Sequence, residues 1–251
     1  MHRRNFLQSV SALALIDSER ARSETVRYVG RSNCIEVVRL GKKIQSVTSS
    51  SPMFLTLSRD RKFLFAVNFI DNFEGLPAGS VESFYIQPQS GHLTLIGRRS
   101  LSLSSTFPRH CAVSPNGRHL VVAAHGGGTY NVLPVDASGE LGPVMQVIKE
   151  IGCGPDPARQ ASAHPHSVAF DASGRFLIGT DLGSDRINVF RCEDGHMVRV
   201  QRKSTASGSG PATIIVNPAQ PTFTILHELK PLVARYQLDP QSGLIREILY
   251  G

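Results

Sequence analysis

The sequence predicts an all-β fold: a β-propeller of four-stranded antiparallel blades, with about four full blades and a shortened first blade. Two series of residues predict it, because turn glycines and strand-opening prolines both recur about every fifty residues. The third observation is that the runs between them are short and apolar, and no long helix is predicted. A β-sandwich is the alternative, but it gives no reason for so regular a period.

The glycines and the prolines recur along the chain with similar spacing. The glycines lie 48 to 56 residues apart in similar segments such as Gln-Ser-Gly-His-Leu, and they are Gly41, Gly91, Gly139, Gly195 and Gly243. The prolines lie 46 to 57 residues apart, each before an apolar run, and they are Pro52, Pro108, Pro165 and Pro211. Shared spacing of two independent features indicates a structural repeat.

Each unit runs through four predicted strands in a fixed order. The proline opens the first strand, and a turn such as Asn116-Gly117 or Ser173-Gly174 leads to a second strand, predicted at 63–67, 120–124, 176–180 and 223–226. A third strand is predicted at 81–86, 130–135, 187–190 and 232–238, and it leads to the repeat glycine and a fourth strand. The first blade, at 28–47, is abbreviated. Residues 28–251 are therefore predicted to form a single domain.

The repeat also predicts where a site lies, because the first strand of each blade lines the central channel and equivalent positions form rings around it. The strand interiors are alike in every unit, whereas the strand tips vary between charged, polar and apolar residues. Such variation indicates a ligand-facing surface, and solvated loop ends are the alternative. The tips are Met53, Arg109, His166 and Ala212 after the prolines, Asn68, Ala124, Asp181 and His227 at the second-strand ends, then Phe69, His125, Leu182 and Glu228.

Charge and cysteine content exclude several classes of protein. The chain has 27 Lys and Arg against 20 Asp and Glu, a net charge of +7, but the basic residues are scattered and lack interleaved aromatics, so we expect no nucleic-acid partner. The 4 cysteines contain no Cys-x-x-Cys pair, which argues against a zinc ribbon. No segment approaches the roughly 18 apolar residues of a membrane-spanning helix, so we expect no membrane insertion.

Residues 1–27 have the layout of a signal-like leader. Arg3-Arg4-Asn5-Phe6-Leu7-Gln8 resembles the twin-arginine signal, and a short apolar run from Ser9 to Ile16 follows it. The run stops at Asp17, and no clean small-x-small cleavage site follows. The leader predicts an exported, periplasmic protein, and a cytoplasmic protein with an ordinary amphipathic N-terminus is the alternative.

From about Tyr28 to Gly251 the chain resembles the lactonase family of seven-bladed propellers, the 6-phosphogluconolactonase-like proteins. The most specific segments are 160–166 leading into 167–171, then 181–186, and Glu228-Leu229. Residues 121–128 resemble the family's Ala-Asn-Tyr-Gly-Gly-Gly segment, with Ala124-His125 in place of Asn-Tyr. The resemblance implies a hydrolase of glucose metabolism that opens a sugar lactone such as 6-phosphogluconolactone in the propeller channel, without a cofactor.

Lactone hydrolysis requires a base that activates water and a donor for the carbonyl oxygen as it becomes an oxyanion. His164 and His166 are two residues apart in an extended strand and can share a face, so one is a candidate base and the other a candidate donor. Glu228 is the alternative base, provided that burial raises its pKa. Asp181 is expected to orient a histidine or to bind sugar hydroxyls. A His-x-His metal site lacks a clear third ligand, so none is expected.

Substrate binding needs cations at the same channel end. Arg109 and Arg186 are candidates for contact with a carboxylate, a phosphate or the oxyanion, because a guanidinium binds such groups with two parallel hydrogen bonds. His110 and His125 at neighbouring strand tips complete the expected substrate-binding set. For Arg186 the alternative is a structural ion pair with Asp185, and for His164 it is a strand-entry residue.

The chain departs from the family pattern in three places. Ala212-Thr213 stands where the family usually has Arg-His, and Asn68-Phe69 where it has Asn-Glu. About two further blades are expected beyond residue 251, so an open arc would expose an edge that self-association could cover. The alternatives to an active carboxylic-ester hydrolase are therefore a non-catalytic exported propeller that binds a ligand or partner, and a truncated, degenerate lactonase.

Overall fold

The structure is a computed structural model that describes residues 26–248, and the predicted leader lies almost wholly outside the described residues. Within that range 19 strands form five antiparallel sheets, one of three strands and four of four strands, without a helix. The predicted all-β fold of four full blades and one short blade is therefore confirmed. Within residues 26–248 no helix is long and apolar enough to cross a membrane.

Each sheet is one blade and its strands pair in chain order. The first blade contains β1 (Val26–Gly30), β2 (Cys34–Arg39) and β3 (Lys42–Thr48). The second contains β4 (Pro52–Leu57), β5 (Phe63–Asn68), β6 (Ser80–Ile86) and β7 (Leu93–Ser100). The third contains β8 (Pro108–Val113), β9 (His119–Ala124), β10 (Thr129–Pro134) and β11 (Gln146–Lys149). The fourth contains β12 (Pro165–Phe170), β13 (Phe176–Asp181), β14 (Arg186–Glu193) and β15 (His196–Ser204). The fifth contains β16 (Pro211–Val216), β17 (Thr222–His227), β18 (Val233–Leu238) and β19 (Ile245–Ile248).

Both residue series occupy the positions that the repeat predicts. Each repeat proline is the first residue of an inner strand, where the missing N–H costs least. The repeat glycines lie in the turns before the fourth strand, or before the third in the short first blade, and all have φ between 74° and 83°, a left-handed conformation that favours glycine. The repeat is therefore maintained by local backbone requirements at its turns.

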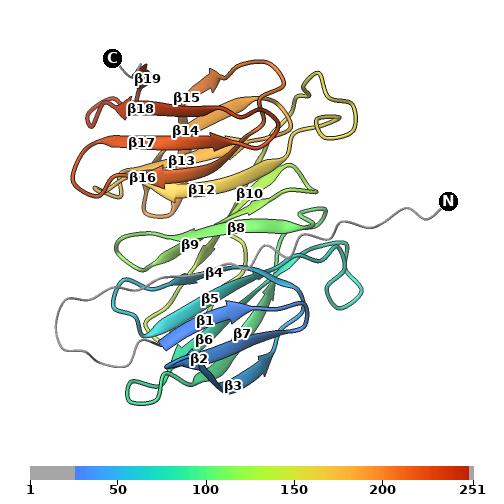
Figure 1. Cartoon of the computed structure of the whole chain (residues 1–251), viewed down its shortest axis with the longest axis vertical. Helices are drawn as coiled ribbons and strands as arrows, with labels where there is room; N and C mark the ends of the chain where they lie inside the picture. The colour runs from blue at the N-terminus through green and yellow to red at the C-terminus, as the bar shows by residue number, and fades with distance from the viewer. Residues whose placement is uncertain (1–25, 249–251) are drawn as a thin grey trace.

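The blades follow one another as an arc, with the N-terminal blades at one end of the long axis and the C-terminal blades at the other (Figure 1). Strand β1 contacts β4, and the inner strands β4, β8, β12 and β16 contact one another in sequence. Four apolar clusters fill the spaces between successive blades, such as that of Phe176, Ile178, Phe223 and Ile225 between the fourth and fifth. Burial between blades thus sets their order.

The outer face of the fifth blade differs from the other faces. Leu226 of β17 is 37% exposed, whereas Val67, Ala123 and Thr180, at the same place in the three preceding blades, are fully buried under the next blade. Ile215 and Val233 are more than half exposed. At Leu226 this face therefore exposes an apolar side chain where the three preceding blades bury the equivalent residue.

Candidate active site

A β-bulge in each of the inner strands β4, β8, β12 and β16 leaves one residue outside the strand pairing. The pairing register shifts between the repeat proline and the second residue after it in β4, β8, β12 and β16. The residue in between is unpaired in the ladder, and a bulge commonly re-aims such a side chain. In β8 and β12 these residues are Arg109 and His166. The residue after each repeat proline therefore has the same local backbone irregularity in four blades, and two of these residues are predicted site residues.

Glu228, directly after β17, is the point where the ring side chains meet. Nε2 of His166 lies 3.2 Å from Oε2 of Glu228, and Nη2 of Arg109 lies 3.9 Å from the same oxygen. Arg159, from the loop before β12, donates through Nη2 to Oε1 of Glu228. Two guanidiniums and one imidazole thus surround one carboxylate, contributed by three different blades.

The cluster keeps Glu228 ionised and His166 neutral. Contact with His166, then the hydrogen bond from Arg159 and the charge of Arg109, hold the pKa of Glu228 well below its usual range although burial opposes them. Burial lowers the pKa of His166, and Glu228 offsets this only in part. The condition under which Glu228 serves as the base is therefore not met, because its pKa falls where an active base needs it raised.

Several buried donors and acceptors in and beside the cluster lack a hydrogen-bond partner. Nε of Arg109, Nδ1 of His125 and Nδ1 of His166 are buried and make no hydrogen bond among the described residues. The 3.2 Å approach of His166 Nε2 to Glu228 also lacks the direction of a regular hydrogen bond. Unsatisfied buried polar atoms are costly, and several in one place indicate a ligand site.

His125 and His164 form a stacked pair beside His166. Their ring centroids are 4.5 Å apart, and Nδ1 of His164 donates to the backbone oxygen of His125 at 2.9 Å. The ring of His125 meets that of His166 edge-on at 6.2 Å. Burial lowers the pKa of His125 to about 3, so this imidazole is neutral at pH 7. The structure therefore brings three predicted site residues together: His125, His164 and His166.

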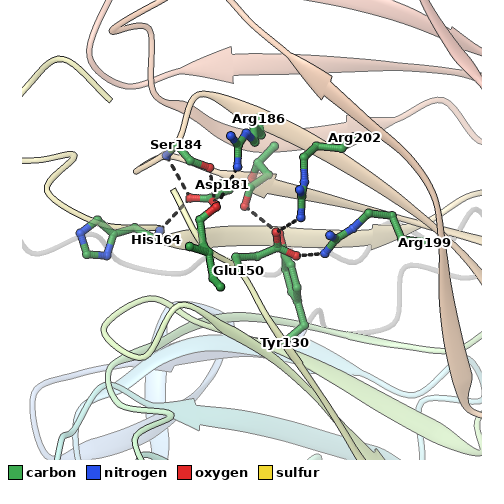
Figure 2. Close-up of polar contacts among 10 residues, drawn as sticks. Tyr130, Glu150, His164, Asp181, Ser184, Arg186, Arg199 and Arg202 are labelled. Carbon is green, nitrogen blue, oxygen red and sulfur yellow. Dashed lines mark hydrogen bonds and ion pairs between the residues drawn. The ribbon is translucent and has the colours of Figure 1, made fainter. Parts of the chain in front are cut away.

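Asp181 binds the backbone N–H of His164 from the protein interior. The prediction that Asp181 contacts sugar hydroxyls directly is wrong, because the residue is fully buried. Its carboxylate is fully buried and accepts from the backbone N–H of His164 at 2.7 Å and of Gly183 at 3.1 Å. Ser184 donates through both its N–H and its hydroxyl (Figure 2). With these donors in place, Asp181 can orient the histidine segment, but no ligand reaches it.

Two of the expected substrate-binding residues lie outside the Glu228 cluster. His110 stacks on Phe54 at 3.7 Å and lines a groove of about 490 Å³, and burial lowers its pKa to about 3. Arg186 (Figure 2) donates to the backbone oxygen of Ile151 at 2.8 Å. It lines a separate depression with Cys153 and Ser204. Neither residue contacts Glu228 or His166 through an observed ion pair or hydrogen bond, whereas Arg109 does approach Glu228.

Arg159 is the site residue that sequence reasoning missed. It directly precedes the segment 160–166, which carries a motif, so its neighbourhood was visible. Its partner Glu228 lies in another blade, however, and no local pattern pairs them. Within residues 26–248 no three or more His, Cys, Asp or Glu side chains are grouped to hold a metal ion. All four cysteines are free.

The chain matches a protein family, curated relatives and solved structures that share this fold. The family described as "Lactonase, 7-bladed beta-propeller" matches residues 22–250. The chain is 25% identical over 198 residues to a 6-phosphogluconolactonase of Bacillus subtilis, covering 79% of the chain and 54% of that protein. It is 30% identical over 176 residues to a 6-phosphogluconolactonase of Pectobacterium atrosepticum, covering 68% of the chain and 48% of that protein. The chain thus spans about half the length of the curated relatives it matches.

Among solved structures, a periplasmic gluconolactonase of Pseudomonas aeruginosa superposes with a TM-score of 0.81 at 28% identity. The match covers 90% of this chain and 68% of that one. A structure from Bacteroides uniformis, described as a possible 6-phosphogluconolactonase, superposes with a TM-score of 0.75 at 24% identity, a likeness of fold alone.

Proposed function

The chain belongs to the lactonase family of seven-bladed β-propellers, and on this premise we propose that it hydrolyses a sugar lactone at the Glu228 cluster. The observation that carries the proposal is the neutral, largely buried His166 held 3.2 Å from the ionised Glu228, beside the unpartnered Nε of Arg109. The proposed substrate is a gluconolactone or its 6-phosphate, in keeping with the names of the relatives.

His166 acts as the general base in this proposal. A water oxygen attacks the lactone carbonyl carbon, its proton passes to His166, and the carbonyl oxygen becomes an oxyanion. When the ring C–O bond breaks, the leaving ring oxygen takes the proton from the imidazolium, which yields a hydroxy acid. Glu228 stabilises the transient imidazolium, as a carboxylate beside a catalytic histidine does.

Arg109 supplies the charge stabilisation. Its Nε–H is buried without a partner, so it is ready to donate to the developing oxyanion without first breaking another bond. With two guanidiniums facing one carboxylate, the cluster retains an excess positive charge when His166 is neutral. That charge suits the carboxylate of the product or a phosphate on the substrate.

A lactone panel tests the proposal on the full chain, with the uncatalysed opening of each lactone subtracted. His166→Ala is expected to lower kcat/KM by roughly 10² to 10⁴-fold, the usual cost of a lost general base. His92→Ala, at an exposed hairpin histidine, is the matched control and should leave it unchanged. Turnover that survives in His166→Ala would overturn the assignment of the base.

A non-catalytic propeller that binds a ligand or a partner protein is the second candidate. Ala212 favours it, because this ring position is 5% exposed and offers no polar group to a substrate. A truncated, degenerate lactonase is favoured by the same residue. Binding of gluconate without lactone turnover would support either over the enzyme, and a cooperative thermal transition would exclude a remnant that does not fold.

We also propose export to the periplasm through the twin-arginine-like leader and self-association through the outer face of the fifth blade. The periplasmic neighbour supports the first. The exposed Ile215, Leu226 and Val233 support the second. Fractionation of cells that express the full chain, and a fusion whose Arg3 and Arg4 are changed to Lys, test export. No nucleic-acid partner and no cofactor are proposed.

A further inference from the structure

Asp185 is a buried carboxylate on which three loops converge. It lies in the loop between β13 and β14, is 6% exposed, and has φ of 53°. Its Oδ1 accepts from Nε2 of Gln160 at 2.8 Å and from the N–H of Gly210 at 2.8 Å, and its Oδ2 accepts from the N–H of Gly208 at 2.6 Å. These donors belong to the loops before β12 and before β16. Asp185 therefore ties the fourth blade to the fifth.

The first branch from Asp185 fixes the backbone of Arg159. Gln160, the next residue, is fully buried, and its Nε2 also donates to the backbone oxygen of Leu182 at 2.8 Å. A Cβ on Gly154 would lie 2.4 Å from Oε1 of Gln160, so the side chain fits only because residue 154 is glycine. The amide of Gln160 thus anchors the loop that carries Arg159.

The second branch fixes the backbone of Glu228. The N–H of Glu228 donates to the backbone oxygen of Gly210 at 2.8 Å, and the N–H of Gly210 is the group that Asp185 holds. The neighbouring Leu229 makes a parallel bond to the oxygen of Ser209 at 3.1 Å. Glu228 therefore takes its place from the same loop that Asp185 anchors.

The two branches meet again in the ion pair between Arg159 and Glu228, which closes a circuit through Asp185. We propose that Asp185 is a positioning residue that holds Arg159 and Glu228 in contact, and through Glu228 sets the orientation of His166. This inference rests on the proposed function of the Glu228 cluster. The two acidic residues of the segment 181–186 then have different roles. Asp181 holds the backbone of His164, and Asp185 holds the loop that positions Glu228.

Asparagine at position 185 isolates this role. Asn tolerates a positive φ, so the backbone conformation is retained. The amide offers one acceptor oxygen to three donors and turns its own N–H₂ toward them, so the circuit loosens. Arg159 then contacts Glu228 for less of the time. The carboxylate, now less neutralised, favours the imidazolium of His166 more strongly.

The test compares Asp185→Asn with Arg159→Gln in the full chain. We expect both to lower kcat by about 10- to 100-fold, the scale of a small misplacement at a catalytic centre, with a smaller change in KM. The acidic limb of the kcat/KM profile should move to higher pH by up to about one unit in both variants. Because they act on one contact, the double variant should lose little more than either single variant.

Asp136→Asn is the matched control, because Asp136 also accepts two backbone N–H groups, from Ser138 and Glu140, in an exposed hairpin remote from the cluster. It should keep the wild-type kcat and pH profile. If Asp185→Asn fails to fold, Gln160→Leu removes one branch alone and must reproduce the Arg159→Gln profile. A folded Asp185→Asn or Gln160→Leu protein with the wild-type kcat and pH profile would overturn the proposal.

The titration of His166 by NMR separates this inference from the proposed function. A wild-type chain that turns over no lactone contradicts the proposed function. In that chain the His166 pKa must still rise in Asp185→Asn and stay unchanged in Asp136→Asn, and an unchanged value in Asp185→Asn refutes the positioning role independently.

Discussion

Nε2 of His166 lies 3.2 Å from Oε2 of Glu228. His166 follows the proline that opens β12 in the fourth blade, and Glu228 directly follows β17 in the fifth blade. The bulge in β12 aims the imidazole, and the loop before β16 holds the carboxylate. The proposed chemistry follows from this one approach across a blade interface.

Glu228→Gln should lower kcat by about 10²-fold, because the transient imidazolium loses its carboxylate partner. Glu228 raises the pKa of His166 against burial, so its removal should move the acidic limb of the kcat/KM profile to lower pH. This shift is opposite in sign to that expected for Arg159→Gln. Glu247→Gln, at an exposed carboxylate of β19, is the control and should change neither value.

Arg109→Gln should lower kcat by roughly 10² to 10³-fold, the usual cost of removing an oxyanion donor. Arg109→Lys should recover part of that loss, because it restores the charge but not the Nε–H that is unpartnered in the wild type. Steady-state kinetics on one lactone checks both variants. Arg118→Gln, at an exposed turn of the same blade, controls for loss of charge; an Arg109→Gln enzyme with wild-type kcat would remove Arg109 from the mechanism.

Glu150 predicts an unusual pH dependence of stability. Its side chain is fully buried between Arg199 and Arg202 (Figure 2), and burial outweighs both guanidiniums, so its pKa is raised. A group with a raised folded-state pKa adds stability below its unfolded pKa and loses it as pH rises through the folded value. Relative to Glu150→Gln, the wild type should therefore gain stability as the pH falls from 7 toward 4.

Thermal unfolding of both proteins across that pH range measures the difference. Glu247→Gln, at the exposed carboxylate of β19, serves again as the control for the loss of one carboxylate. If the wild type instead loses stability relative to Glu150→Gln on acidification, the two ion pairs outweigh burial and the pKa of Glu150 is lowered rather than raised.

The outer face of the fifth blade predicts self-association that depends on concentration. Ile215→Glu places a charge among Leu226 and Val233 and should shift the mass in solution toward the monomer, because a buried unpaired charge opposes association. Val198→Glu, at an exposed apolar residue of β15, is the matched control. A wild-type chain that stays monomeric at high concentration would contradict this prediction.

Much of the fold could be read from the sequence because its signals are local. The repeat glycines need a left-handed turn and the prolines open a strand, so both series recur wherever the same backbone is built. The rings at the strand tips follow from that repeat. His166 and Arg109 were found in this way, since a repeat makes equivalent positions comparable without any knowledge of their contacts.

Burial and pairing across blades were decided only by the tertiary structure. The sequence could not tell that Asp181 is sealed behind His164, that Arg186 turns to the oxygen of Ile151, or that Arg159 reaches Glu228. The direction of the Glu228 pKa also depends on neighbours from other blades. Side-chain contacts between segments distant in sequence leave no periodic trace, because each depends on how blades pack and on where loops such as that of Asp185 are tied.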